Sequence, residues 1–362
     1  MYIGIDGNEA NLPTRVGVGQ FAYNLLTHLF QLDKANTYYI YLKQPPLPDM
    51  PKAGNHWHYR VFGPTKLWTK FALPFHLYTD GLKLDLFYSP GHYSPRFSPF
   101  PTIPTIHDLG YLSNVDQFTK KDFYQLTRWT KQSLKQARHI IAVSQFTKDE
   151  IHRIYGIDEN KISVVYNGVG DIPICSSDVL AKFNISRPYF LYLGTLKPSK
   201  NLPFLISSFA SYLRRTRTRQ LLVIAGKKGW LFDEIFNTVK KEHLEKSVIF
   251  TDYISEVDKW ALYKNAITTV LPSLYEGFGM PAIESQQAGT PVIVSFIPSL
   301  KEILGGFAIY IDPVNQNGLV NALMEVQNPH IRKTLVDYGL SHSKKFTWTS
   351  SAKSLLAAFN KL

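Results

Sequence analysis

Two glutamates, Glu276 and Glu284, are separated by seven residues in a glycine-containing stretch, LPSLYEGFGMPAIESQQAGTPVIVS at positions 271–295. Gly277 and Gly279 leave the backbone uncovered by side chains, so their N–H groups can approach an anion closely. A helix that starts beyond them favours negative charge at that end. Carboxylates accept hydrogen bonds from sugar hydroxyls. The stretch therefore indicates either a site for a phosphorylated, hydroxyl-rich ligand such as a nucleotide sugar, or only a tight connection with a solvated Glu284.

Lysines follow another expected strand, in Gly-Thr-Leu-Lys-Pro-Ser-Lys-Asn at positions 194–201. Lys197 and Lys200 supply compact positive charges that could neutralise a diphosphate leaving group. The alternative is a pair of solvated surface lysines. The segment 226–229, Gly-Lys-Lys-Gly, has a similar pattern with less specificity.

The first half of the chain holds two weaker candidates. Gly17 and Gly19 precede an expected helix and offer backbone N–H groups, and Arg15 nearby could add charge. They do not complete the dinucleotide-binding fingerprint, which needs a third glycine. His107 follows an expected strand and could donate to a sugar hydroxyl or transfer a proton, although a lone histidine is more often structural.

These residues must be positioned by short apolar runs that alternate with amphipathic segments, which is typical of parallel sheets with covering helices. The first half predicts strands at 2–6, 38–42, 58–62, 84–88, 103–106, 139–143 and 162–166, and helices at 18–32, 67–78, 120–137 and 145–155. The second half predicts strands at 189–193, 221–225, 248–251, 267–271, 291–295 and 308–311. In the last helical stretch before 291, Pro281 suits the first turn and Gly289 suits a left-handed C-terminal cap.

The pattern stops and restarts around a segment rich in glycine, proline and serine. We therefore expect an α/β protein with a first domain at 1–170, a hinge at 171–188 and a second domain at 189–346. Both domains are expected to be doubly wound and Rossmann-like, facing each other across a cleft, with ligands at the carboxyl ends of the strands.

The composition narrows the partners and the compartment. The net charge is +12, with an isoelectric point near 9.4, which favours anionic partners. A single cysteine, Cys175, excludes an internal disulfide and fits a reducing compartment. No apolar run is long enough to span a membrane, and the N-terminus does not look like a signal peptide. We expect a cytoplasmic protein.

The expected helix at 120–137 carries a basic face. Its cations and the one just beyond it are spaced to share one side, and they are Lys121, Arg128, Lys131, Lys135 and Arg138. Phe123, Tyr124 and Trp129 are interleaved with them. The face is either an ordinary solvated one or a peripheral contact with an anionic membrane.

The motifs taken together resemble the retaining glycosyltransferases of family 4, which have the two-domain GT-B fold. The resemblance covers nearly the whole chain, and its most specific part is the pair Glu276 and Glu284 in their setting. Further matching stretches follow in the family's order: RVGVGQF, TIHDLGYL, IIAVSQFTKDEI, VVYNGV, YLGTLKPSKN, VIAGKKGW and KKFTWTSSA. Two of the stretches, LGTLKPSKNLPFL and AGKKGW, look most like bacterial mannosyltransferases of surface-polysaccharide assembly.

The resemblance implies roles for the matched residues. Glu276, His107 and Lys200 are expected to act in catalysis, with Glu276 holding the donor sugar and Lys200 the diphosphate. The implied donor-binding residues are Gly17, Gly19, Lys197, Lys200, Gly277, Phe278, Gly279, Met280 and Glu284. The segment 277–280 would act through its backbone, and Glu284 would accept from ribose hydroxyls. The helix at 347–362 is expected to cross back to the first domain.

One pair of positions departs from the family's pattern. Many relatives pair the lysine with an arginine, at places that are Thr195 and Ser199 here. Lys197 or Arg15 could substitute, although neither gives the same forked contact from the same place.

The implied reaction transfers a hexose from a GDP- or UDP-linked sugar to a carbohydrate or lipid-linked hydroxyl acceptor. The anomeric configuration is kept, and no metal or other cofactor is used. One alternative is another GT-B enzyme, such as a sugar-nucleotide epimerase or a phosphorylase. A nucleic-acid binder is a second alternative, but the even spread of charge and the lack of a binding module count against it.

Overall fold

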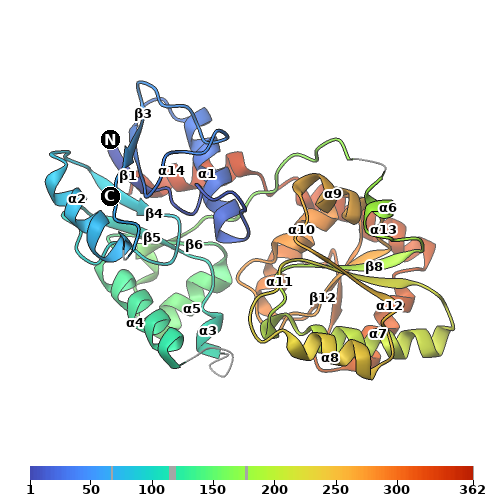
Figure 1. Ribbon diagram of the computed structural model, residues 1–362. Coiled ribbons are helices and arrows are strands. Elements are labelled where there is room, and N and C mark those ends of the chain that lie inside the picture. Colours follow the sequence, from blue (N-terminus) through green and yellow to red (C-terminus); the bar gives the residue numbers. More distant parts are fainter. Residues whose placement is uncertain (67, 114–119, 176–177, 362) are drawn as a thin grey trace. The chain divides into compact units, whose positions relative to one another are not determined.

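A computed structural model of the chain describes residues 1–66, 68–113, 120–175 and 178–361. The chain forms two compact units (Figure 1). The first unit combines Met1–Gly170 with Thr347–Leu362, and the second is Asp171–Phe346. Each unit has its own parallel sheet, so the prediction of two doubly wound α/β domains is confirmed.

The first unit is built on a seven-stranded sheet with the order β3-β2-β1-β4-β5-β6-β7. Every strand pair in it is parallel. The inner strands β4, β5 and β6 are buried along their whole length, as expected for apolar runs covered on both faces. The strands are β1 (Tyr2–Asp6), β2 (Thr37–Leu42), β3 (Trp57–Val61), β4 (Leu86–Ser89), β5 (Thr102–Ile106), β6 (Ile140–Ala142) and β7 (Ile162–Val164).

The helices of the first unit cover its sheet. The C-terminal helix α14 packs against α1, and the ring of Trp348 meets the edge of Phe21 at 5.9 Å between centroids. The helices are α1 (Val18–Leu32), α2 (Leu73–Thr79), α3 (Gly110–Ser113), α4 (Lys120–Gln136), α5 (Gln145–Tyr155) and α14 (Trp348–Phe359), with short turns η1 (Trp68–Ala72) and η3 (Glu159–Lys161).

The segment predicted as one helix at 67–78 differs from the expectation. Residue 67 lies outside the described part, and the rest forms the π-helical turn η1 followed by α2. Pro74 stands in the first turn of α2, where its missing N–H breaks no helical hydrogen bond. The α-helix therefore begins beside the proline instead of running through it.

The second unit is built on a six-stranded parallel sheet with the order β10-β9-β8-β11-β12-β13. The strands are β8 (Tyr189–Leu193), β9 (Leu221–Ala225), β10 (Val248–Asp252), β11 (Thr268–Leu271), β12 (Val292–Ser295) and β13 (Ile309–Ile311). This order, 3-2-1-4-5-6 by position in the unit, is that of a dinucleotide-binding sheet. Its direction of winding reverses between β8 and β11.

Helices cover both faces of this second sheet (Figure 1). One layer holds α7 (Leu202–Thr216), α8 (Asp233–Lys241) and α12 (Gln316–Glu325), which pack together. The other holds α6 (Val179–Lys182), α9 (Glu256–Asn265), α10 (Met280–Gln287) and α13 (Pro329–Ser343). The remaining elements are α11 (Pro298–Leu304) and the 3₁₀ turn η4 (Pro198–Lys200). Helix α6 lies within the segment expected to be a hinge, and it packs on α9.

No described helix is long and apolar enough to cross a membrane.

Candidate active site

The loops that follow β8 and β11 form the centre of the candidate site in the second unit. These strands are neighbours in the sheet, and the winding direction reverses between them. Such a switch point leaves room for a ligand beyond the carboxyl ends of the strands. The loop after β8 carries Lys200, and the loop after β11 carries Glu276. The topology therefore brings together two residues that are 76 positions apart.

Lys200 and Glu276 form a short ion pair. The Lys200 Nζ lies 2.5 Å from Glu276 Oε1, and the same oxygen accepts from the Ser273 hydroxyl at 2.7 Å. Both side chains are largely buried, at 17% and 11% exposure. Oε2 of Glu276 accepts no hydrogen bond from the described residues, so one carboxylate oxygen remains available to a hydroxyl. Ser273 was not among the predicted site residues.

Backbone hydrogen bonds hold the loop after β8 in place. The Leu196 N–H donates to the Lys227 carbonyl, and the Gly229 N–H donates to the Leu196 carbonyl, each at 2.9 Å. The two lysine-containing segments noted in the sequence are thus one paired structure. Lys197 Nζ lies 5.3 Å from the centre of the Trp230 ring.

A left-handed glycine links the loop after β11 to α10. Gly279 has φ of 90° and is the residue before the helix, where a Cβ would come within 2.3 Å of Leu300 Cδ2. Only glycine fits there without strain. Pro281 is in the first helical turn, as predicted, and Met280 is the first helical residue. Phe278 is buried and packs edge-on against Phe346, at 5.7 Å between ring centres.

Glu284 is held by two side chains that sequence reasoning missed. Lys259 Nζ lies 2.6 Å from Oε1, and the Tyr263 hydroxyl donates to Oε2 at 3.0 Å. Both partners belong to α9, whereas Glu284 belongs to α10. The spacing of four between Lys259 and Tyr263 places them on one face of a helix, which is the only signal the sequence offered.

This cluster shifts the pKa of its members. Burial lowers the pKa of Lys259, but the carboxylates of Glu284 and Glu256 outweigh it and leave that pKa above its ordinary value. Burial, reinforced by Glu284, raises the pKa of Tyr263 well above the usual range. Lys259 is therefore charged and Tyr263 is a hydroxyl donor at neutral pH. Near Glu276, the pKa of the buried Tyr192 is also raised, first by burial and then by the Glu276 charge.

Thr195 and Ser199 stand at the two positions where many relatives have an arginine, and neither supplies a positive charge. Ser199 is buried, and its hydroxyl has no hydrogen-bond partner among the described residues. The Thr195 carbonyl accepts from the Tyr192 hydroxyl at 3.4 Å. Arg15, considered as a substitute cation, forms a bidentate pair with Asp49 at 2.5 and 2.9 Å and donates to the Ala10 carbonyl. The guanidinium of Arg15 is thus bound within the first unit in this structure, and its role as a second cation for the diphosphate stays a prediction.

The first unit positions the other predicted residues at the carboxyl edge of its own sheet. Gly17 has φ of 47° and immediately precedes α1, so this position also favours glycine. Gly19 is buried in the first turn of that helix. His107 follows β5, and its ring meets the edge of Phe21 at 4.8 Å.

The tautomer of His107 follows from its partner. Nε2 lies 2.7 Å from the Pro90 carbonyl, which only accepts, so Nε2 carries the proton and donates. Nδ1 is then an acceptor, which favours accepting from a hydroxyl over donating to one. Burial, with a contribution from His92, lowers the pKa of His107 to about 4. The imidazole is therefore neutral at physiological pH.

The basic face predicted for the helix at 120–137 belongs to α4. Arg128, Lys131, Lys135 and Arg138 are exposed, whereas the side chain of Lys121 lies outside the described part. Arg128 donates to the Tyr124 hydroxyl at 2.7 Å. Among the described residues, no three histidine, cysteine, aspartate or glutamate side chains are grouped so that they could hold a metal ion.

Comparison with known proteins identifies relatives of both units. The family model Glycosyltransferase Family 4 matches residues 16–171, and the model Glycosyl transferases group 1 matches residues 180–339. O-antigen chain mannosyltransferase B of Escherichia coli is 28% identical over 290 residues, which cover 76% of this chain and 74% of that protein. O-antigen chain mannosyltransferase RfbU of Salmonella typhimurium is 31% identical over 223 residues. That second match covers 62% of this chain and 60%, less than two thirds, of the relative.

A solved structure shares the fold of the whole chain. The crystal structure of Anabaena HepE in complex with UDP-glucose superposes with a TM-score of 0.75 and 15% identity, covering 100% of this chain and 99% of that one. At this identity the likeness concerns the fold alone. Since a glycosyltransferase family model matches each unit and the fold is GT-B, the chain is a glycosyltransferase of the GT-B fold that resembles bacterial polysaccharide mannosyltransferases.

Proposed function

We propose that this glycosyltransferase moves a hexose of mannose or glucose type from a nucleotide diphosphate sugar to a hydroxyl acceptor, with the anomeric configuration kept. The product is a polysaccharide or glycolipid. Two relatives named O-antigen mannosyltransferases support the hexose and the polysaccharide. The UDP-glucose bound by HepE supports a nucleotide diphosphate sugar as donor. The base is that of GDP or UDP.

The observation that carries this proposal is the Lys200–Glu276 pair beside the start of α10. Negative charge grows on the departing diphosphate, and Lys200 supplies a positive charge that is already in place. When phosphate oxygens reach Lys200, the Glu276 carboxylate is released from part of its ion pair. Glu276 then accepts from the hydroxyls of the donor sugar, starting with its available oxygen.

The other donor contacts follow from the same edge of the sheet. The backbone of residues 277–280 contacts the sugar and the distal phosphate, where the helix dipole of α10 favours negative charge. Glu284 accepts from ribose hydroxyls through oxygens that Lys259 and Tyr263 hold in place. Lys197 is the second cation for the diphosphate. The roles of Gly17, Gly19 and His107 in the first unit stay predictions.

The chemistry needs no metal in this proposal, because lysine and the helix start neutralise the leaving group. The departing phosphate oxygen takes the proton of the acceptor hydroxyl as the new glycosidic bond forms. The acceptor is a carbohydrate or a lipid-linked saccharide, and peripheral contact with an anionic membrane stays a prediction.

A donor screen followed by an assay tests the proposal. We expect GDP-mannose or UDP-glucose to raise the melting temperature, because a ligand that binds only the folded state stabilises it. The same donor should release nucleotide diphosphate only when an acceptor is added, and EDTA should leave the rate unchanged. Release without acceptor would indicate a hydrolase, and conversion of the donor sugar without release would indicate an epimerase. No stabilisation by any nucleotide sugar would contradict the proposal.

A further inference from the structure

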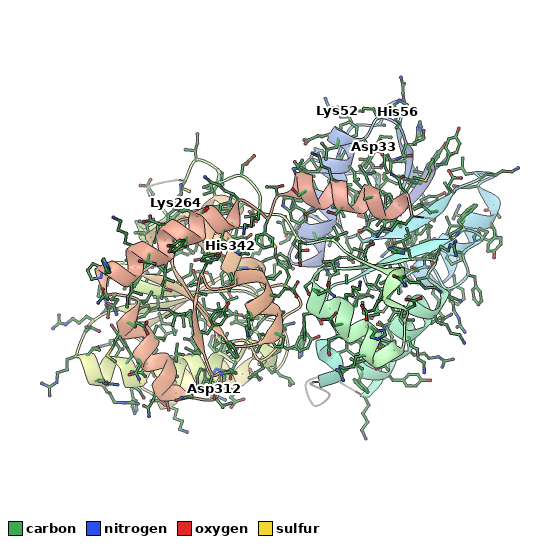
Figure 2. The ribbon with its side chains drawn as sticks, turned by 180° about the vertical axis from the view of Figure 1, so that it is seen from behind. Asp33, Lys52, His56, Lys264, Asp312 and His342 are labelled. Carbon is green, nitrogen blue, oxygen red and sulfur yellow. The ribbon has the colours of Figure 1, made fainter. Side chains whose placement is uncertain are left out.

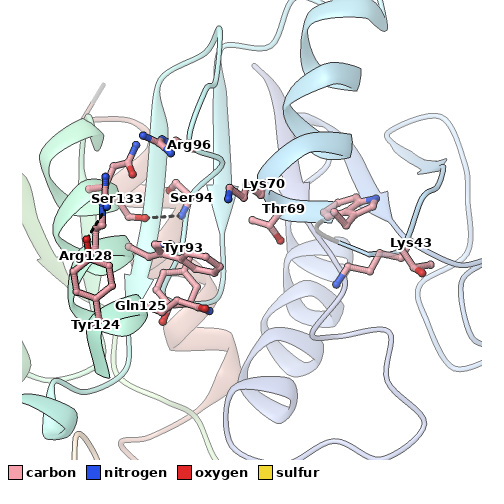
Figure 3. A pocket seen from close by; sticks show the side chains of 14 residues that line it. Lys43, Thr69, Lys70, Tyr93, Ser94, Arg96, Tyr124, Gln125, Arg128 and Ser133 are labelled. Atoms are coloured by element: carbon pink, nitrogen blue, oxygen red, sulfur yellow. Dashed lines mark hydrogen bonds between the residues drawn. The ribbon is translucent and has the colours of Figure 1, made fainter. Parts of the chain in front are cut away.

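A pocket of about 460 Å³ lies within the first unit and is separate from the Lys200–Glu276 pair. Figure 3 shows side chains of α4 on one side, those of η1 and Lys43 on the other, and Tyr93 and Ser94 between them. The volume is in the range of small-molecule binding sites. The pocket is thus large enough for a small ligand or for one part of a larger one.

The pocket lies where the topology favours a ligand. Lys43 follows β2, and Tyr93 and Arg96 are in the loop after β4, so these parts of the wall are at the carboxyl edge of the first sheet. That sheet changes its direction of winding between β1 and β4. The loop after β4 also provides the Pro90 carbonyl that accepts from His107. One loop therefore connects the pocket wall to the histidine predicted to act in catalysis.

The charge of the pocket lining is one-sided. Of its 14 described residues, four are cationic and none is acidic, and the cations are Lys43, Lys70, Arg96 and Arg128. None of the four forms an ion pair with a carboxylate among the described residues. Lys43 is partly balanced by the nearby carboxyls of Asp6 and Glu9. Desolvation raises the pKa of both carboxyls, and the charge of Lys43 offsets part of that rise. The other three cations have no such counter-charge in the described part of the chain.

Aromatic rings take the place of carboxylates beside these three cations. Lys70 lies over the Phe71 ring at 5.2 Å, Arg96 over Phe97 at 5.3 Å and Arg128 over Tyr124 at 5.8 Å. Phe71, Phe97 and Tyr124 are 58%, 58% and 61% exposed. Cation–π contacts orient a positive charge without neutralising it. The cations therefore remain able to bind an anion.

The inner wall offers a ring surface next to these charges. Tyr93 and Trp129 both line the pocket and meet edge to face at 5.4 Å. Such rings pack against the apolar faces of sugars or lipid chains. The arginines supply planar forks that match two phosphate oxygens at once.

We propose that this pocket binds a phosphorylated group joined to a sugar or lipid. The phosphate contacts Lys70, Arg96 and Arg128, and the attached group lies against Tyr93 and Trp129. The phosphate belongs either to a lipid headgroup or to a saccharide free in solution. If it belongs to the acceptor, the inference deepens the proposed function, but binding itself is independent of any transfer reaction.

Binding of inorganic pyrophosphate tests the site. Lys70→Gln/Arg96→Gln should weaken pyrophosphate binding at this site tenfold or more by calorimetry, because each exposed cation loses a charged contact. The measurement is made in a Lys200→Ala background, so that the Lys200 site does not contribute. Lys131→Gln/Lys135→Gln is the matched control, since it removes the same charge from exposed positions of α4 outside the pocket. The melting temperature of each variant checks that it is folded.

Vesicles identify the source of the phosphate. The same variants, with Lys200 intact, are sedimented with phosphatidylcholine vesicles that do or do not contain phosphatidic acid. Loss of sedimentation with the acidic vesicles in the pocket variant alone supports the site with a lipid headgroup. Loss of pyrophosphate binding alone supports it with a soluble phosphate. If the pocket and control variants behave alike in both measurements, the proposal is wrong, whatever the outcome of the donor assay.

Discussion

The carboxyl edges of the two sheets have the same topology and different chemistry. In each unit the first and fourth strands are neighbours, and the winding direction reverses between them. The second unit places a lysine against a glutamate at this point. The first unit places a neutral histidine near its reversal point. It also lines a pocket with cations that form no ion pair with a carboxylate of the described residues. The difference shows that the fold provides a location, whereas the loops decide which ligand chemistry is possible.

Within the second unit, two lysine–glutamate pairs also differ from each other. Lys259 joins α9 to Glu284 on α10, and both carboxylate oxygens are occupied. Lys200 joins two loops, and the hydrogen bonds from Lys200 and Ser273 both fall on the same oxygen of Glu276. The pair between helices should therefore support the fold, and the pair between loops should mainly support ligand binding.

The largest expected effect comes from breaking the pair between helices. Lys259→Ala leaves Glu284 charged in a site that is only about a tenth exposed. An uncompensated buried charge costs about 3–5 kcal/mol. Calorimetry should show a fall in melting temperature of roughly 6 °C or more.

Lys264→Ala is the matched control, because Lys264 is an exposed lysine of the same helix (Figure 2). It should change the melting temperature by no more than about 2 °C, in keeping with a surface substitution within about 0.5 kcal/mol. Removing both charges with Lys259→Ala/Glu284→Ala should recover part of the lost stability. If the two single lysine variants melt alike, the structural role of this pair is refuted.

The next largest effect comes from breaking the pair between loops. Lys200→Ala and Glu276→Ala should each lower the turnover about a hundredfold or more, the scale of losing one preorganised stabilising contact. Their melting temperatures should change less than that of Lys259→Ala, because loops at strand ends can admit water around the remaining charge. Turnover and melting are measured on the same preparations. Lys246→Ala, an exposed lysine of the second unit, should keep normal turnover.

Equal turnover in Lys200→Ala and Lys246→Ala would remove Lys200 from the site. A loss of stability in Lys200→Ala as large as that in Lys259→Ala would instead remove the distinction between the two pairs.

Most of the fold could be predicted because the sheets are parallel and buried on both faces. Continuous apolar runs such as 189–193 and 221–225 coincide with β8 and β9 as the structure has them. The helix α1 begins where Gly17 and its neighbours predicted it. Local patterns fail where a proline interrupts a helical stretch, as in η1 and α2, and at a short helix such as α6, which lies in the segment expected to be a hinge.

The candidate site could be predicted less completely, because side-chain pairing depends on distant segments. The two glutamates and Lys200 carry a local signal, since glycines and strand ends surround them. Their partners do not: Lys259 and Tyr263 lie in a helical stretch without a motif of its own, and only the packing of α9 on α10 brings them to Glu284. Arg15 shows the same limit, because its bond to Asp49 depends on a loop 34 residues away.

The smallest expected effect concerns the neutral histidine of the first unit. The pKa of His107 is lowered to about 4 in the folded protein, from an ordinary value near 6.5. Between these values the unfolded chain binds a proton that the folded chain does not, so stability is complete above pH 6.5 and falls as the pH decreases. His107→Asn lacks this pH-dependent contribution to the stability. Between pH 7 and pH 5 its melting temperature should therefore fall by about 2–5 °C less than that of the unsubstituted protein.

His56→Asn, at an exposed position (Figure 2), is the control and should show the same pH dependence as the unsubstituted protein. If the melting temperatures of His107→Asn and the unsubstituted protein fall equally with pH, His107 takes up a proton in the folded state as well. The first unit would then lose the neutral histidine that distinguishes its edge from that of the second.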